Sequence, residues 1–222
     1  MTINYIDGWM RAEKPHLVMR TMRANGWLRD HAPEVDRLYG IPQRSEHHPE
    51  IDAGVHTELA LEVAGTLSQD PRVRYAALVH DLGKALTPKE LWPRHHGHEE
   101  LGVESSLAFG GRLGVPQEWR VLGAMVCRYH LHAHRSLESS ARSIVRLFRD
   151  AGLFERPDLI EPFTLACEAD ARGRAGLQDR AYPQGELLRT AFGVAHGVEV
   201  ASPLKLHETR IQAVREALAL SD

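Results

Sequence analysis

Apolar residues recur at three- and four-residue steps through most of the chain, the spacing that places them on one face of an α-helix. Five stretches carry this pattern: 59–67, 73–80, 119–127, 160–167 and 211–218. Alternating apolar and polar runs bounded by turn dipeptides, which are typical of β-strands, are essentially missing from the sequence. The pattern therefore predicts an all-α protein that folds as a helical bundle.

Stretches rich in glycine and proline separate the predicted helices. The segments 40–49, 83–97 and 173–185 combine these residues and are expected to be mostly irregular. From these breaks we expect three parts: a short helical preface over residues 1–45, a core over residues 46–175, and a C-terminal helical extension over residues 176–222 packed on that core.

Composition and charge narrow the class of protein. The 222 residues are 43% hydrophobic and 26% charged, which is ordinary for a globular protein that needs no disulfide to fold. The net charge of −3 excludes a basic surface over the whole molecule and leaves a local basic patch open. The spacing of Cys127 and Cys167 matches neither a zinc motif nor a disulfide framework. The sequence shows no signal peptide and no apolar run of the roughly 20 residues that a membrane span needs. We therefore predict a cytoplasmic protein without a membrane partner.

Histidine is the unusual residue, with 14 copies, several of them clustered. His80 continues the apolar face of the stretch 73–80, so its side chain should point into the core, and Asp81 follows it near the end of the helix. A buried imidazole beside a buried carboxylate is costly unless a partner neutralises the pair. A divalent cation is one such partner.

The same test places further polar residues on the apolar faces of other predicted helices: His56, His98, His130 and Asp170. One histidine of this kind is more often a hydrogen-bonded core residue, but five helices sharing the feature are hard to explain independently. Imidazoles and carboxylates without thiolates suit Mn, Fe, Co, Ni or Zn, with Mg a further candidate. Such a metal generates hydroxide from bound water and polarises a phosphoryl oxygen, so the set predicts a hydrolytic site for a phosphate ester.

A family resemblance rests on these same positions. His56, His80-Asp81 and Asp170 follow the H…HD…D signature, so the chain resembles the HD-domain metal-dependent phosphohydrolases. This resemblance implies an HD-domain helical bundle with a buried metal site, in which these four residues bind a divalent metal. In relatives with two metals, additional histidines lie between the HD pair and the last aspartate, and His98 and His130 match those places.

Longer strings are similar to one branch of that family. Residues 48–56 (HPEIDAGVH), 80–98 (HDLGKALTPKELWPRHHGH), 168–174 (EADARGR) and 182–185 (YPQG) resemble the C-terminal HD region of bacterial multifunctional CCA-adding tRNA nucleotidyltransferases. The resemblance implies 2′,3′-cyclic phosphodiesterase, 2′-nucleotidase and phosphatase activities, with nickel favoured for the phosphatase. It also implies nucleotides or RNA 3′ ends as substrates and tRNA as a partner.

The chain departs from those enzymes at its N-terminus. They carry a nucleotidyltransferase domain with a glycine-rich loop and a carboxylate pair for magnesium, and the residues before His56 do not match it. We therefore expect a free-standing HD protein or a separately expressed domain that does not add CCA.

Catalytic and substrate-binding roles follow from the chemistry of the remaining candidates. We expect Asp81 also to orient the attacking water and Lys84 to neutralise a phosphate oxygen. His98 and His130 are expected either to protonate a leaving oxygen or to bind a second metal, since an imidazole does both near neutral pH. Arg172 and Arg174 are candidate phosphate clamps, with a solvated surface cation as the alternative. His47 and His48 are expected to pack in a loop outside the metal set. The remaining clustered histidines are expected to lie at the rim or exposed to solvent, also outside that set: His95, His96, His132 and His134.

Other functions are compatible with parts of this pattern. A non-catalytic module that binds tRNA or RNA ends would have a basic groove and weak metal binding. An HD hydrolase of another nucleotide phosphate would share the ligands and differ in the wall of its pocket. A purely helical interaction protein would leave the buried histidines and aspartates unexplained.

Overall fold

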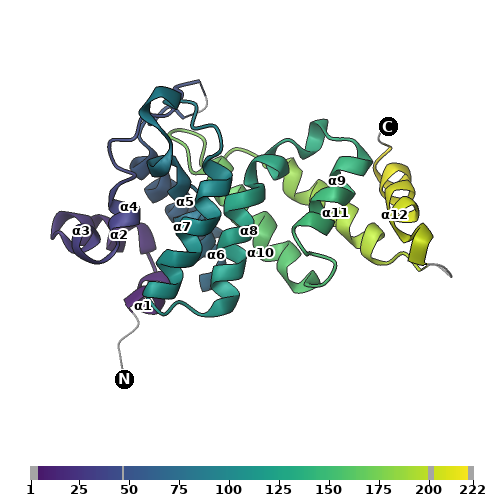
Figure 1. The fold of residues 1–222 in the computed structure, drawn as a ribbon, viewed down its shortest axis with the longest axis horizontal. Coiled ribbons are helices and arrows are strands. Elements are labelled where there is room, and N and C mark those ends of the chain that lie inside the picture. The colour runs from purple at the N-terminus through teal and green to yellow at the C-terminus, as the bar shows by residue number, and fades with distance from the viewer. Residues whose placement is uncertain (1–4, 47, 200–202, 220–222) are drawn as a thin grey trace.

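The computed structural model describes residues 5–46, 48–199 and 203–219, and these residues form twelve α-helices and no β-strand (Figure 1). Short 3₁₀ turns and loops join the helices. In the described part of the chain, backbone pairing of the β type is limited to an isolated antiparallel bridge between Pro42 and Asp52. The prediction of an all-α fold is confirmed. Among the helices of the described residues, none is both long enough and apolar enough to cross a membrane.

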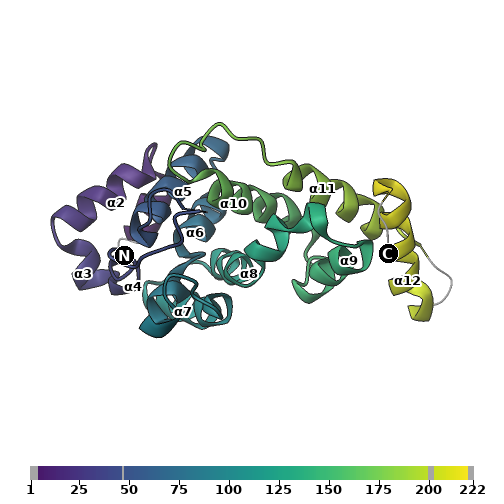
Figure 2. The same cartoon turned by 90° about the horizontal axis from the view of Figure 1, so that it is seen from above.

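Four short helices form one end of the molecule (Figures 1 and 2). They are α1 (Tyr5–Arg11), α2 (Pro15–Ala24), α3 (Trp27–His31) and α4 (Pro33–Asp36). Trp9 of α1 and Met19 of α2 are fully buried, and they belong to the same hydrophobic core as Tyr75 and Leu78 of the central bundle. The first helices are therefore packed into the bundle, while the division of the chain at residues 45 and 175 stays a prediction.

The central bundle contains the five helices that carry the candidate ligands. They are α5 (Ala53–Leu67), α6 (Pro71–Val79), α7 (His98–Arg112), α8 (Gln117–His134) and α10 (Ile160–Arg172). Side-chain caps start two of them: Asp52 accepts a hydrogen bond from the amide of Val55 at 2.9 Å, and Asp70 accepts one from the amide of Arg72 at 2.8 Å. Each such cap stabilises its helix by about 1 kcal/mol, which fixes where the helices begin.

The buried face of α7 differs from the predicted one. Helical spacing from His98 predicts that Leu101, Ser105 and Phe109 share one buried face; Phe109 is buried, whereas Leu101 is 38% exposed and Ser105 is half-buried. The buried residues of this helix are His98, Gly102, Ser106, Phe109 and Gly110. Gly102 has no side chain, so its backbone can approach that of Gly83 in the 3₁₀ turn at Leu82–Leu86, a requirement that a search for large apolar residues overlooks.

Three helices extend the molecule at the opposite end (Figure 2). They are α9 (Ala141–Asp150), α11 (Pro183–His196) and α12 (Pro203–Leu218). Phe148, Phe192 and Val214 are buried in a second hydrophobic core that continues into α8 and α10. The predicted loop 173–185 is wrong in its last residues because Pro183 begins α11, where the missing amide hydrogen of proline costs nothing.

Candidate metal centre

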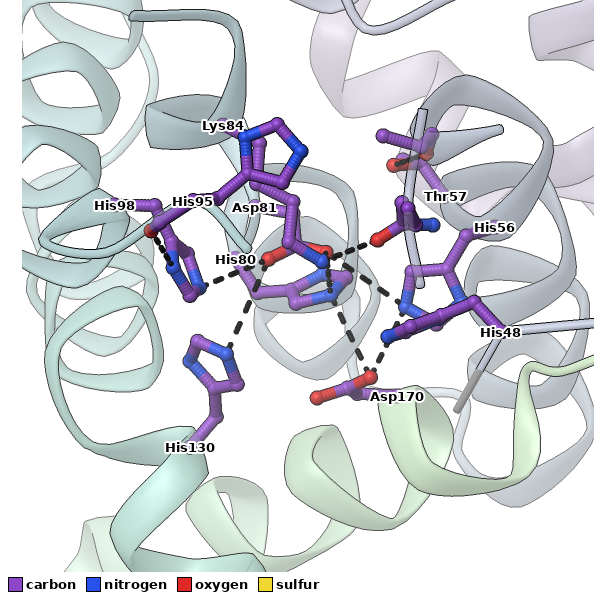
Figure 3. Close-up of polar contacts among 12 residues, drawn as sticks. His48, His56, Thr57, His80, Asp81, Lys84, His95, His98, His130 and Asp170 are labelled. Carbon is purple, nitrogen blue, oxygen red and sulfur yellow. Dashed lines mark hydrogen bonds and ion pairs between the residues drawn. The ribbon is translucent and has the colours of Figure 1, made fainter. Parts of the chain in front are cut away.

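Side chains from five helices meet in one buried cluster (Figure 3). His56 comes from the first turn of α5 and Asp170 from the end of α10. His80 ends α6, and Asp81 follows it at the start of the 3₁₀ turn. His98 opens α7, and His130 lies on α8. All six are at most 5% exposed, so the structure brings together every residue that the sequence placed at a metal.

The six residues form two groups of three that could each hold a metal ion, with ligand atoms within 4.8 Å of one another. In the first group, the Nε2 atoms of His56 and His80 lie 3.0 and 3.6 Å from Oδ1 of Asp170. In the second, Nε2 of His98 and of His130 lie 3.4 and 3.9 Å from Oδ1 of Asp81.

Asp81 connects the two groups. While its Oδ1 faces the second group, its Oδ2 lies 3.1 Å from Nε2 of His80 and 3.8 Å from Nε2 of His56 in the first. One carboxylate thus turns one oxygen to each group, so Asp81 could contribute a ligand atom to both.

Backbone carbonyls orient all four imidazoles. Nδ1 lies 2.8–2.9 Å from a carbonyl oxygen in each ring, the partners being Gly173, Ala77, His95 and Val126 for His56, His80, His98 and His130. A carbonyl only accepts hydrogen bonds, so Nδ1 carries a hydrogen and Nε2 is the nitrogen left to bind a cation or a proton in the cluster. Metal-binding histidines are held in this way in proteins generally.

Three of the atoms that face the cluster make no hydrogen bond. They are Nε2 of His80, Oδ1 of Asp81 and Nε2 of His98, all fully buried. A buried polar atom without a partner costs about 1–3 kcal/mol. Divalent cations in the two groups would satisfy all three atoms, and nitrogen and carboxylate donors suit a first-row metal. The residues therefore fit a metal on their geometry and on their chemistry.

The electrostatics of the cluster also favour a cation. Burial alone raises the pKa of the Asp81 carboxyl, but the charges of His80 and Lys84 outweigh burial and hold this pKa well below its usual value. Asp170 behaves in the same way, with His80 as the largest opposing charge. Burial lowers the pKa of His80, but the two carboxylates raise it to about 9. His130, farther from the carboxylates, has its pKa lowered to about 3 by burial.

The shifted pKa of His80 predicts a pH-dependent stability for the protein stripped of metal by a chelator. The folded state holds this proton up to about pH 9, whereas the unfolded state releases it near 6.5. The folded state therefore binds more protons between these values, so its stability should fall as the pH rises through this window, by up to about 3 kcal/mol. Urea unfolding at pH 6.5, 8 and 9.5 measures the loss.

The metal-loaded protein is the matched control. A metal bound at Nε2 of His80 takes the place of the proton, so this part of the pH dependence should disappear and the stabilisation by metal should grow with pH. Equal slopes of unfolding free energy against pH with and without metal would contradict the assignment of His80.

A cavity of about 520 Å³ opens directly over the cluster, and the predicted phosphate-binding residues differ in how they reach it. Lys84 lines it, donates to Oδ2 of Asp81 at 2.6 Å and also donates to Gln43. Arg174 lines it too, with Nη2 4.0 Å from Oδ1 of Asp170. Arg172 does not line this cavity, because its guanidinium is held by Glu168 at 2.7 Å and by the carbonyl of Gln178 at 2.8 Å.

Several histidines that were expected to lie outside the cluster take part in its surroundings. His48 lines the cavity, and its Nδ1 lies 3.0 Å from Glu50, which is also 3.2 Å from Nδ1 of His56. His95 is buried and hydrogen-bonded to Thr87 and to a backbone carbonyl, so its expected place at the rim is wrong. His96 and His132 are exposed as expected, and His47 lies outside the described residues.

His134 holds the ligand Asp170 in place from outside the cluster. Its Nε2 lies 2.7 Å from Oδ2 of Asp170, and its Nδ1 lies 2.9 Å from the hydroxyl of Tyr182. These contacts hold the oxygen of Asp170 that points away from His56, which fixes the orientation of the ligand. Its position four residues after His130, on the same helical face, was a signal that the sequence offered.

The fold and the cluster define a class: an all-helical protein with a buried histidine and aspartate centre that can hold a divalent metal. Comparison with known families agrees, because the HD domain matches residues 54–171, from the start of α5 to the end of α10. The chain belongs to the HD domain family, whose members bind divalent metals and are in general metal-dependent phosphohydrolases.

Two relatives show which group of HD-domain proteins this chain is similar to. The chain is 50% identical to the Multifunctional CCA protein of Alkalilimnicola ehrlichii over 186 residues, which are 84% of this chain and 45% of that protein. It is 46% identical to the protein of the same name from Methylococcus capsulatus over 218 residues, which cover 92% of this chain and 51% of that protein. The chain thus spans about half the length of these relatives and matches their HD region.

Proposed function

We propose that the protein is a hydrolase of 2′,3′-cyclic and 2′-phosphates at the ends of nucleotides or RNA, with tRNA among its substrates. The observation that carries the proposal is Asp81, whose two oxygens face two separate pairs of imidazoles. The similarity to Multifunctional CCA proteins supports the choice of phosphate.

The residues divide into ligands and substrate contacts. We assign His56, His80, Asp81 and Asp170 to one divalent cation, with nickel, manganese, cobalt, iron, zinc and magnesium as candidates. His98 and His130 are assigned, with Asp81, to a second cation instead of proton transfer, because their Nε2 atoms point at the carboxylate. A divalent cation held by these residues would lower the pKa of a bound water and polarise a phosphoryl oxygen.

Basic side chains over the metal centre bind the phosphate in this proposal. The ammonium group of Lys84 lies beside Asp81 and faces the cavity, where it can neutralise a phosphate oxygen next to the metals. Arg174, which also lines the cavity, contributes a second positive charge. Water then adds to phosphorus and one P–O ester bond breaks, which opens the cyclic phosphate or releases inorganic phosphate from a 2′-monoester.

Hydrolysis assays test the proposal. Purified protein is incubated with 2′,3′-cyclic AMP, 2′-AMP, 3′-AMP and 5′-AMP, each with nickel, manganese, cobalt, magnesium or a chelator. We expect turnover that depends on a transition metal and favours the cyclic and 2′-phosphates. Preference for 5′-AMP would instead favour an HD hydrolase of another nucleotide phosphate. Folded, metal-loaded protein without turnover on any substrate would favour the non-catalytic RNA-end binding module.

A further inference from the structure

A second, smaller hollow of about 250 Å³ adjoins the metal-site cavity, and Arg174 lines both. Its wall includes His134, Leu137, Arg172, Arg180 and Tyr182. Small-molecule sites typically measure about 300–1,000 Å³, so the larger cavity of about 520 Å³ suits a terminal nucleotide and the smaller one suits only part of a ligand.

The hollow lies immediately behind the metal centre. His134, which lines it, is hydrogen-bonded to Oδ2 of Asp170, while Oδ1 of the same carboxylate belongs to the metal cluster. The segment that links α10 to α11 crosses the surface here and supplies Arg174, Arg180 and Tyr182 (Figure 2). A ligand bound at the metals therefore needs to extend only past Arg174 to enter the second hollow.

Three guanidinium groups make the hollow cationic. Arg172 is fixed in place by Glu168 and by a backbone carbonyl. Arg174 has a fully buried Nε without a hydrogen-bond partner. Arg180 is exposed, and among the described residues its side chain has no ion pair or hydrogen bond. Arg180 can therefore offer its donors to an anion, whereas Arg174 can do so only through its terminal Nη atoms, since its Nε is fully buried.

The positive charge continues around the main cavity. Besides Arg174, four lysine and arginine residues line it: Arg44, Lys84, Arg94 and Arg135. Its acidic lining residues are Glu99 and the two assigned metal ligands, Asp81 and Asp170. The chain as a whole has a net charge of −3, so this concentration of cations is local to the site. A substrate with more than one phosphate uses such a surface better than a mononucleotide does.

We propose that the second hollow binds the phosphate on the 5′ side of the terminal nucleotide, so that the preferred substrate is an RNA 3′ end. This proposal rests on the proposed function. Arginine forms paired hydrogen bonds with phosphate oxygens, which Arg174 and Arg180 can supply. The ring of Tyr182 and the half-exposed Leu137 offer apolar surface for the preceding sugar and base.

Comparison of two substrates tests the subsite. The kcat/KM is measured for 2′,3′-cyclic AMP and for an RNA trinucleotide ending in a 2′,3′-cyclic phosphate, with wild type, Arg180→Ala and Arg149→Ala. We expect wild type to prefer the trinucleotide and Arg180→Ala to lower the trinucleotide-to-mononucleotide ratio about 10-fold, the value of one hydrogen bond to a charged group. Arg149 is an exposed arginine on α9 and should leave both values unchanged.

Other outcomes would overturn the subsite. Equal kcat/KM values for the two substrates in wild type, or an equal loss on both in Arg180→Ala, would remove it and leave the proposed function standing. If neither substrate is hydrolysed, the proposed function fails instead, and fluorescence anisotropy with a labelled trinucleotide still decides the subsite, because equal affinities of wild type and Arg180→Ala would exclude it. Adenosine 2′,5′-bisphosphate hydrolysed as well as the trinucleotide would show that no preceding nucleotide is needed and would overturn the RNA assignment.

Discussion

Replacing Asp81 with asparagine is expected to lower kcat/KM for the preferred phosphate ester on the order of 1,000-fold or more. Its two oxygens face both groups of histidines, so in the proposed two-metal centre the substitution removes a ligand from both cations. The loss should exceed the roughly 10–100-fold that follows when only an outer partner of a metal ligand is changed. Metal analysis of the purified variant should show that the content of both sites has fallen.

The same substitution also leaves His80 and Lys84 without their shared counter-charge. Breaking a buried ion pair costs about 3–5 kcal/mol, so activity is compared well below the unfolding temperature of the variant, with its helix content checked by circular dichroism. Asp158→Asn is the matched control, because Asp158 is exposed and pairs with Arg156 on the surface. A folded Asp81→Asn protein with near-normal turnover would show that this carboxylate is not a metal ligand.

The fold and the ligand cluster could be inferred from the sequence because both depend on helical periodicity. His80 lies on the apolar stripe that buries Val73, Ala76 and Ala77, so its direction follows from its position on the helix. His56, His130 and Asp170 could be placed on buried faces by the same reasoning. That the five helix ends meet in one cluster depends on how the helices pack. The sequence supported this expectation because five predicted helices each carried a polar residue on an apolar face, and because the chain resembled a known family.

Contacts that depend on loops could not be inferred in this way. His48 and Glu50 reach His56 from an irregular segment, where no period indicates the direction of a side chain. Arg172 and Arg174 lie two residues apart near the end of α10, yet Arg172 braces the following loop and Arg174 faces the metal centre. Their difference depends on the carbonyl of Gln178, which only the folded loop brings near.

Close approach between backbone segments also could not be inferred from the sequence. One such contact, at Gly83, two residues after Asp81, predicts a second large effect, on the stability of the protein. A Cβ atom at this position would lie 1.9 Å from the carbonyl oxygen of His98 and 2.6 Å from the amide nitrogen of Gly102. Both are backbone atoms of α7 and cannot rotate away as a side chain can. Gly83→Ala should therefore push α7 from the 3₁₀ turn and destabilise the protein by more than the 1–3 kcal/mol typical of overpacking, at least about 3 kcal/mol.

The displacement should also impair metal binding, because His98 is the first residue of α7 and lies 3.4 Å from Asp81. We expect Gly83→Ala to lose the proposed second metal before the first, because His56, His80 and Asp170, the residues proposed to hold the first, do not belong to α7. Gly193→Ala is the control: Gly193 is exposed in α11 and a Cβ there meets no atom within 4 Å, so alanine should raise stability by about 0.5–1 kcal/mol. Urea unfolding of both variants gives the comparison, and a free energy of unfolding for Gly83→Ala equal to that of Gly193→Ala would mean that α7 does not depend on glycine for its contact with the turn.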